Sequence, residues 1–154
     1  MGKSIQDILQ TTKFKNEQHK ATLNLLYSAY WMKTHFSLAI KEHGLTAEQF
    51  NVLRILKGKH PEQLCVKDIS GRMIEKSSNV PRIIDRLITK KLVVRSISKE
   101  DKRETLIALT DKGIKQLAEA SLIIDNVNSS ILGLSEVEAE QLNVLLEKLR
   151  MVDL

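Results

Sequence analysis

Residues 77–113, with the sequence SSNVPRIIDRLITKKLVVRSISKEDKRETLIALTDKG, carry the pattern that decides the fold. The apolar residues of the first part recur at steps of three and four, which predicts a helix capped by Ser77 or Ser78. Two strand-like segments, 92–97 and 104–109, follow this helix and are joined by a wholly polar connection, which predicts a β-hairpin. The stretch therefore combines a polar, basic helix with a basic hairpin directly after it.

Positive charge is concentrated around the same stretch. Residues 54–103 hold fourteen Lys or Arg and six Asp or Glu, a local net charge of +8. The remaining 104 residues have a net charge of −3, and the whole chain has +5. A concentrated positive field of this kind is suited to a polyanion such as a nucleic acid.

The composition excludes several classes of protein. With 154 residues, 42% of them hydrophobic and 28% charged, the chain fits one soluble globular domain and not a disordered protein. No apolar run approaches the roughly 18 residues that span a bilayer. The start, MGKSIQDILQ, lacks the hydrophobic stretch of a secretory signal. A single cysteine, Cys65, excludes an internal disulfide and suits a reducing compartment, so we expect a cytoplasmic protein.

Three helices are predicted upstream of the deciding stretch. The first covers about 16–43 and is closed by Gly44 as a left-handed cap. The second begins at a capping box over 46–49. Residues 64–75 predict a short extended entry and a short third helix, in which Gly71 indicates the close approach of a neighbouring helix.

Two further helices are predicted downstream, over about 110–130 and from a second capping box at 135–138 onward. The fold class is therefore mainly α with a small β-hairpin wing, a winged helix-turn-helix in the order α-α-(β)-α-α-β-β-α-α. We expect residues 1–154 to form a single domain in which 46–109 is the DNA-binding module. The apolar stripes of the outer helices exceed the needs of one small core, which predicts dimerisation through residues 16–44 and 110–154.

The helix that begins at Ser77 has the composition of a DNA-reading helix. An α-helix fits the major groove, where base edges present distinguishable donors and acceptors, and a hairpin tip can reach the neighbouring backbone or minor groove. Ser77, Ser78 and Asn79 are small polar residues near its start, where the helix dipole favours phosphate. Arg82 and Arg86 are four residues apart and can face the groove together.

Two segments resemble the MarR family of bacterial transcription regulators. Residues 101–113, DKRETLIALTDKG, are similar to the wing signature of that family, which is Asp-x-Arg, a strand, and then Leu-Thr-x-x-Gly. Residues 77–87, SSNVPRIIDRL, resemble its recognition helix with an Arg-x-x-Asp-x-Leu core. The chain departs from the family at two positions, because Pro81 stands where Thr is frequent and Lys91 where Gly is common.

The resemblance implies roles for the residues of the hairpin. Arg103 is expected to enter the minor groove, and Asp101 to hold a neighbouring arginine in place or, alternatively, to cap the turn. Lys99 and Lys102 would contact phosphates, which supply affinity more than sequence choice. Because one reading helix covers only a few base pairs, we expect a homodimeric repressor on a pseudo-palindromic operator of double-stranded DNA.

Aromatic side chains gather in and near the first long helix. Tyr27, Tyr30, Trp31 and Phe50 are candidates for lining a pocket between the dimerisation helices and the reading module, where MarR relatives bind phenolic or other aromatic effectors. An effector would release DNA by favouring a dimer geometry that no longer matches the operator. The alternative is that these side chains serve only core and interface packing.

Other readings of the residues stay open. The chain could be a winged-helix module that binds a protein partner without reading DNA, and Arg82 or Arg86 could pair with Asp85 on a solvated helix. Cys65 could make the protein a thiol redox sensor, but its apolar surroundings and the lack of a resolving cysteine favour a buried structural thiol. No catalytic constellation, phosphate-binding glycine loop or metal-ligand spacing is present in the sequence, so we expect no enzyme, no cofactor and no metal.

Overall fold

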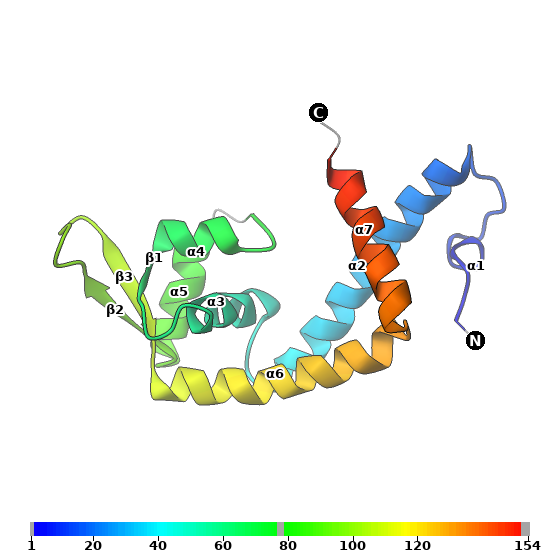
Figure 1. Cartoon of the computed structure of the whole chain (residues 1–154). Coiled ribbons are helices and arrows are strands. Elements are labelled where there is room, and N and C mark those ends of the chain that lie inside the picture. Colours follow the sequence, from blue (N-terminus) through cyan, green and yellow to red (C-terminus); the bar gives the residue numbers. More distant parts are fainter. Residues whose placement is uncertain (1, 77–78, 152–154) are drawn as a thin grey trace.

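The protein is largely helical, with one small sheet at one end (Figure 1). The computed structural model describes residues 2–76 and 79–151. The elements in chain order are α1 (Ile5–Leu9), α2 (Glu17–Lys41), α3 (Ala47–Lys57), β1 (Leu64–Cys65), α4 (Val66–Arg72), α5 (Val80–Thr89), β2 (Val93–Ile97), β3 (Thr105–Leu109), α6 (Asp111–Leu132) and α7 (Glu136–Arg150). The predicted order is confirmed, and α1 is an addition that the sequence pattern did not reveal.

Side-chain caps fix the starts of the long helices. Both predicted capping boxes are present, at Thr46 before α3 and at Ser135 before α7. Helix α2 begins after Asn16, whose side chain accepts the amide N–H of His19. Its end was predicted too late: α2 ends at Lys41, and Gly44, with a φ of 70°, takes the left-handed conformation in the turn that follows.

The predicted hairpin is confirmed and belongs to a three-stranded antiparallel sheet in the order β1-β3-β2. Val93 pairs with Leu109 at one end of the hairpin, and Ile97 pairs with Thr105 at the other. The extended entry predicted at residue 64 is strand β1, in which Leu64 pairs with Ile107. We call β2, β3 and the turn between them the wing.

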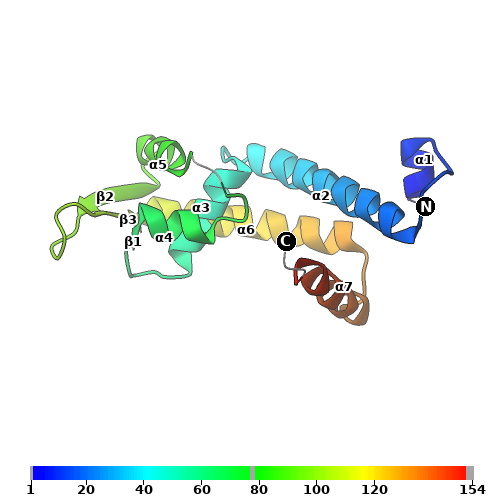
Figure 2. The same ribbon diagram turned by 90° about the horizontal axis from the view of Figure 1, so that it is seen from above.

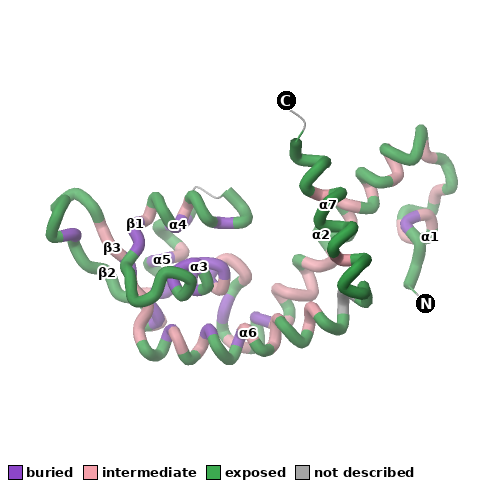
Figure 3. The backbone as a smooth tube through the Cα atoms, in the orientation of Figure 1, coloured by how far each residue is buried: buried purple, intermediate pink, exposed green. Residues whose placement is uncertain are grey.

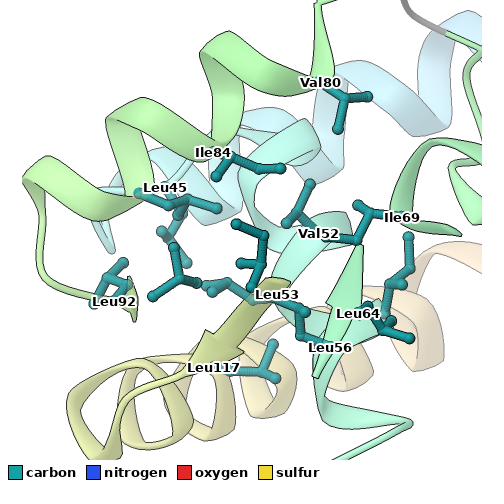
Figure 4. Packing of buried hydrophobic residues seen from close by; sticks show 14 of the residues in the cluster. Leu45, Val52, Leu53, Leu56, Leu64, Ile69, Val80, Ile84, Leu92 and Leu117 are labelled. Atoms are coloured by element: carbon teal, nitrogen blue, oxygen red, sulfur yellow. The ribbon is translucent and has the colours of Figure 1, made fainter. Parts of the chain in front are cut away.

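The hydrophobic core lies between the sheet, helices α3, α4 and α5, and the first half of α6 (Figure 4). Helix α3 contributes the centre of this core through Val52, Leu53 and Leu56, none of them more than 1% exposed. Burial of each such side chain stabilises the fold by about 1.5–3 kcal/mol relative to exposure. The core therefore holds α5 and the wing as one body.

Two glycines show how the packing differs from the prediction. Among the described residues beyond its own helical turn, no atom would lie within 4 Å of a Cβ atom at Gly71, so the predicted close approach of a helix to Gly71 is wrong. Close approach occurs instead at Gly113 in the first turn of α6, where a Cβ atom would lie 2.0 Å from the carbonyl oxygen of Leu92. The backbone of Leu92, in the segment between α5 and β2, therefore lies directly against the backbone at the start of α6.

Helix α6 runs from the sheet to the opposite end of the molecule, where α7 follows it, and α2 packs along it (Figures 1 and 2). Helix α7 has no buried residue, as the tube coloured by burial shows (Figure 3). Its apolar side chains are largely exposed, with 63% exposure for Leu145 and 57% for Leu149. None of the helices over 2–76 and 79–151 combines the length and apolar character needed to cross a membrane.

Candidate nucleic-acid interface

Helix α5 is the predicted reading helix, and it begins later than expected. Its first residue is Val80, with Asn79 in the N-cap position and Pro81 in the first turn, where the missing N–H of proline removes no helix bond. Ser77 and Ser78, predicted as the cap and as DNA contacts, lie outside the described residues.

The two faces of α5 differ in character. One face is fully buried in the core, and it comprises Val80, Ile84 and Leu87. Arg82 and Arg86 are exposed, and their spacing of four residues places them on the same face of the helix. The helix therefore presents two guanidinium groups outward from a rigid base.

Asp85 lies between these arginines in sequence but bonds to neither in the described structure. Its Oδ1 accepts a hydrogen bond from Nη2 of Arg95 on β2 at 2.7 Å. The alternative in which Asp85 pairs with Arg82 or Arg86 within the helix is therefore not what the structure shows. The Asp85–Arg95 ion pair instead links the reading helix to the wing, and both side chains are partly exposed, so its effect is on orientation more than on stability.

The tip of the wing is built by two side chains that accept backbone hydrogen bonds. The buried Ser98 hydroxyl accepts the amide N–H groups of Glu100 and Asp101, at 3.2 and 3.3 Å. The Asp101 carboxylate accepts the amide N–H of Arg103 at 2.9 Å, and the Asp101 carbonyl accepts that of Glu104. Asp101 thus caps the turn, which was the alternative reading, and it holds Arg103 through the backbone and not through a guanidinium.

The predicted wing contacts share one property, which is exposure to solvent. It applies to Lys99, Asp101, Lys102 and Arg103. Because the turn beneath them is fixed by Ser98 and Asp101, the three basic side chains extend from an ordered backbone. This arrangement suits contact with phosphates and with a narrow, electronegative groove.

A cavity of about 660 Å³ lies between α2, α3, α6 and the segment after α4. Tyr30 and Phe50, two of the predicted ligand contacts, line it together with Phe36. Nζ of Lys33 lies 2.6 Å from Oε1 of Glu75 among the lining residues, and this hydrogen bond raises the pKa of Lys33. The cavity is therefore apolar with an ion pair in its wall.

The other two predicted ligand contacts lie elsewhere. Tyr27 and Trp31 line a separate cavity of about 400 Å³ between α1 and α2. The four candidates are thus divided between two sites and do not form one. The reason is helical geometry, since Tyr27 and Trp31 are four residues apart and share a face, whereas Tyr30 is turned about 100° from Trp31.

Cys65 has a structural role at the start of α4. The thiol is buried, and its Sγ accepts the amide N–H of Asp68 at 3.4 Å as the N-cap of the helix. Burial raises the pKa of the Cys65 thiol, which disfavours the reactive thiolate. The geometry favours the buried structural thiol over the redox sensor.

Comparison with known proteins identifies the family. The family model described as transcriptional regulator SarA/Rot matches residues 34–120, more than half of the chain. The chain belongs to the SarA/Rot family of transcriptional regulators. The HTH-type transcriptional regulator YkoM of Bacillus subtilis is 37% identical to this regulator over 109 residues, which is 70% of each chain.

Solved structures share the whole fold of this SarA/Rot-family regulator. Staphylococcus aureus MepR in complex with DNA matches with a TM-score of 0.75 and 25% identity, over 89% of this chain and 97% of that one. Bordetella bronchiseptica BpsR, whose DNA binding is regulated by 6-hydroxynicotinic acid, matches with a TM-score of 0.73 and 28% identity, over 84% and 93%. Two more distant structures, a MarR-like regulator of Bacillus cereus and a MarR-family regulator of a Rhodococcus species, share the fold. The family model, the curated HTH-type relatives and the matched structures together confirm the resemblance predicted from the motifs.

Two residues of the regulator's interface were missed by the sequence analysis. Arg95 was counted only as a positive charge, because nothing in the local pattern indicates that it reaches Asp85 ten positions earlier. Ser98 could have been found, since a serine that precedes a polar turn is a known acceptor for the amide groups that follow it. Arg95 links the wing to α5, and Ser98 fixes the turn that carries the exposed basic side chains of the wing.

Proposed function

We propose that this SarA/Rot-family regulator reads double-stranded DNA as a homodimer and represses transcription from a pseudo-palindromic operator. The observation that carries the proposal is that α5 and the wing, which pack against each other, both carry exposed basic side chains. These side chains are Arg82, Arg86, Lys99, Lys102 and Arg103. The Asp85–Arg95 ion pair and the common core hold these side chains in one body, so they can meet DNA together.

In this proposal the helix and the wing take different parts. Helix α5 enters the major groove, where Arg82 and Arg86 face base edges and phosphates. Arg103 enters the adjacent minor groove, and Lys99 and Lys102 bind the backbone. The structure of MepR with DNA supports DNA binding by this fold, because that protein shares the fold and a quarter of its aligned residues. Reading of chromosomal DNA implies action in the cytoplasm.

The proposed homodimer forms through the helices outside the reading module. The module comprises residues 46–109, and the outer helices lie in residues 16–44 and 110–154. The apolar stripe of α7 is not covered by any part of residues 2–76 or 79–151, and it includes Leu142, Leu145 and Leu149. Burying apolar surface is worth about 25 cal/mol per Å², so a second copy that covers this stripe gains several kcal/mol. Pairing of two modules sets half-sites about 34–36 Å apart.

A small aromatic effector is the second element of the proposal. The cavity of about 660 Å³ lies within the size range of ligand sites, roughly 300–1,000 Å³. The cavity offers an aromatic effector ring contacts with Tyr30, Phe36 and Phe50. The charged groups of Lys33 and Glu75 would orient the effector. The regulation of BpsR by 6-hydroxynicotinic acid supports this part of the proposal. Bound effector would favour a dimer geometry that no longer fits the operator.

The test is a titration of the purified protein against an operator duplex obtained by binding-site selection and against a random duplex, at several salt concentrations. DNA reading predicts that the logarithm of the binding constant falls with the logarithm of salt, with a slope of about −0.9 per neutralised phosphate. Sedimentation at the same concentrations should give a dimer. A slope near zero would refute the proposal that the protein reads DNA. The alternative, a winged-helix module that binds a protein partner, would then be favoured.

A further inference from the structure

Lys90 lies at the end of the reading helix, within the most basic part of the chain, yet its ammonium group is bonded inside the protein. Nζ donates to the carbonyl oxygen of Gly44 and, at 2.8 Å, to Oε1 of Gln49. Lys90 is half-buried, and Gln49 is only 3% exposed. A lysine whose charge is used in this way has fewer donors available for a phosphate.

One acceptor is a backbone carbonyl and the other a side-chain amide, and each is held by local structure. Gly44 lies in the turn between α2 and α3, where its φ of 70° sets the direction of its carbonyl group. Gln49 closes the capping box of α3, since its Oε1 also accepts the amide N–H of Thr46 at 3.3 Å. Lys90 therefore joins the end of α5 to the α2–α3 turn, 41 to 46 residues earlier in the chain.

Helix α6 bonds to both sides of this junction. Nζ of Lys112 donates to the carbonyl oxygen of Lys90 at 3.0 Å, and Nε2 of Gln116 donates to that of His43 at 2.8 Å. The amide N–H of Lys90 in turn donates to the carbonyl oxygen of Arg86 at 3.1 Å. The last turn of the reading helix is thus connected to the α2–α3 turn and α3 through the Lys90 side chain, and to α6 through the Lys90 carbonyl group.

We propose that Lys90 is a positioning residue: its ammonium sets the place of the C-terminal end of α5 relative to the α2–α3 turn and the start of α3, and it does not bind phosphate. The inference rests on the proposed reading of DNA by α5. Side chains that contact bases must be held within about 0.5 Å of their proper positions. Loss of this junction therefore misplaces Arg86, while the other basic side chains of the module keep its positive field. Specific binding therefore depends on Lys90 more strongly than non-specific binding does.

Two adjacent lysines provide a matched test. Lys90→Met and Lys91→Met each remove one positive charge at nearly the same place, but Lys91 is exposed. Dissociation constants are measured for the selected operator duplex and for a random duplex of equal length, at four salt concentrations. We expect Lys90→Met to weaken operator binding at least tenfold, while the dependence of the binding constant on salt keeps the wild-type slope. Its dissociation constant for the random duplex should lie within twofold of that of Lys91→Met. Lys91→Met should change both dissociation constants by one common factor.

A charge-preserving variant covers the case in which Lys90→Met does not fold. Lys90→Arg keeps the charge, but its guanidinium directs its N–H donors in a rigid planar fork, whereas the compact ammonium reaches both acceptors with donors that rotate freely. We expect it to lose operator affinity at least fivefold and to keep random-duplex affinity. Full operator affinity in Lys90→Arg would overturn the proposal, as would an equal loss for both duplexes in Lys90→Met with a salt slope reduced by about one. A wild-type protein without preference for any duplex would instead overturn the proposed function itself.

Discussion

Replacing Gly113 by alanine tests the backbone contact between Leu92, in the segment that joins α5 to β2, and the start of α6. The new Cβ would lie 2.0 Å from the Leu92 carbonyl oxygen and 3.0 Å from its carbon. An ordinary C···O contact is about 3.3 Å, so the two backbones must separate by roughly 1.3 Å. The same Leu92 oxygen accepts the amide N–H and the hydroxyl of Thr110, each at 3.1 Å.

The expected loss of stability follows from these contacts. A separation of this size breaks both hydrogen bonds to Leu92, worth about 1 kcal/mol each, and adds overpacking strain of about 1–3 kcal/mol. Alanine in place of glycine returns about 1 kcal/mol through its higher helix propensity. We therefore expect Gly113→Ala to lower the free energy of unfolding by about 2–4 kcal/mol.

The assay is urea unfolding followed by circular dichroism at one fixed protein concentration, since unfolding of a dimer depends on concentration. Gly71→Ala is the matched control, because it makes the same chemical change in a helix where the added Cβ has open space. The control should be neutral or more stable by up to about 1 kcal/mol. If Gly113→Ala unfolds within about 0.5 kcal/mol of the wild type, the close backbone contact inferred for Leu92 is wrong.

Three further predictions concern single side chains. Lys91 has a φ of 60°, a left-handed conformation that glycine adopts without strain, so Lys91→Gly should raise the urea midpoint by the equivalent of about 0.5–1 kcal/mol; an unchanged midpoint would refute the strain. Arg103→Ala should weaken operator binding by at least about 1 kcal/mol and relax sequence preference, whereas Lys102→Ala should weaken operator and random duplexes alike; equal effects of the two variants would contradict the minor-groove role. Because burial raises the pKa of Cys65 above its ordinary value of 9.0, its unfolded state loses the thiol proton first. The protonated buried thiol therefore makes its full contribution to the free energy of unfolding below about pH 9, and this contribution is lost as the pH rises above that value. Cys65→Val should remove this loss of stability at high pH. If the free energies of unfolding of the wild type and the variant fall in parallel above about pH 9, the thiol is not the cause of the loss.

Local chemistry made the elements predictable. The capping boxes at Thr46 and Ser135, the apolar spacing of α5 and the polar turn of the wing each depend on residues within a few positions of one another. Helix α1 was missed because five residues, Ile5–Leu9, are too few to show a helical period.

Contacts between distant segments were not predictable in the same way. Asp85 has arginines on its own helix, and only the packing of β2 on α5 decides that Arg95 is its partner. The sequence shows that Gly71 and Gly113 both lie in helices, but which of them another backbone approaches depends on tertiary structure. For the same reason Lys90 was counted with the basic residues of the module, although its acceptors lie 41 and 46 residues away.

The length of α6 has a mechanical consequence for operator choice. The helix has 22 residues, so it spans about 33 Å at 1.5 Å per residue, with the reading module at one end and α7 at the other. In a dimer joined near α7, a tilt of about 6° at the joint swings the module end by about 3.4 Å, one base-pair step along DNA. The helix then acts as a lever, because a change of only a few degrees at the joint is enough to shift the position of a reading helix by a whole base pair.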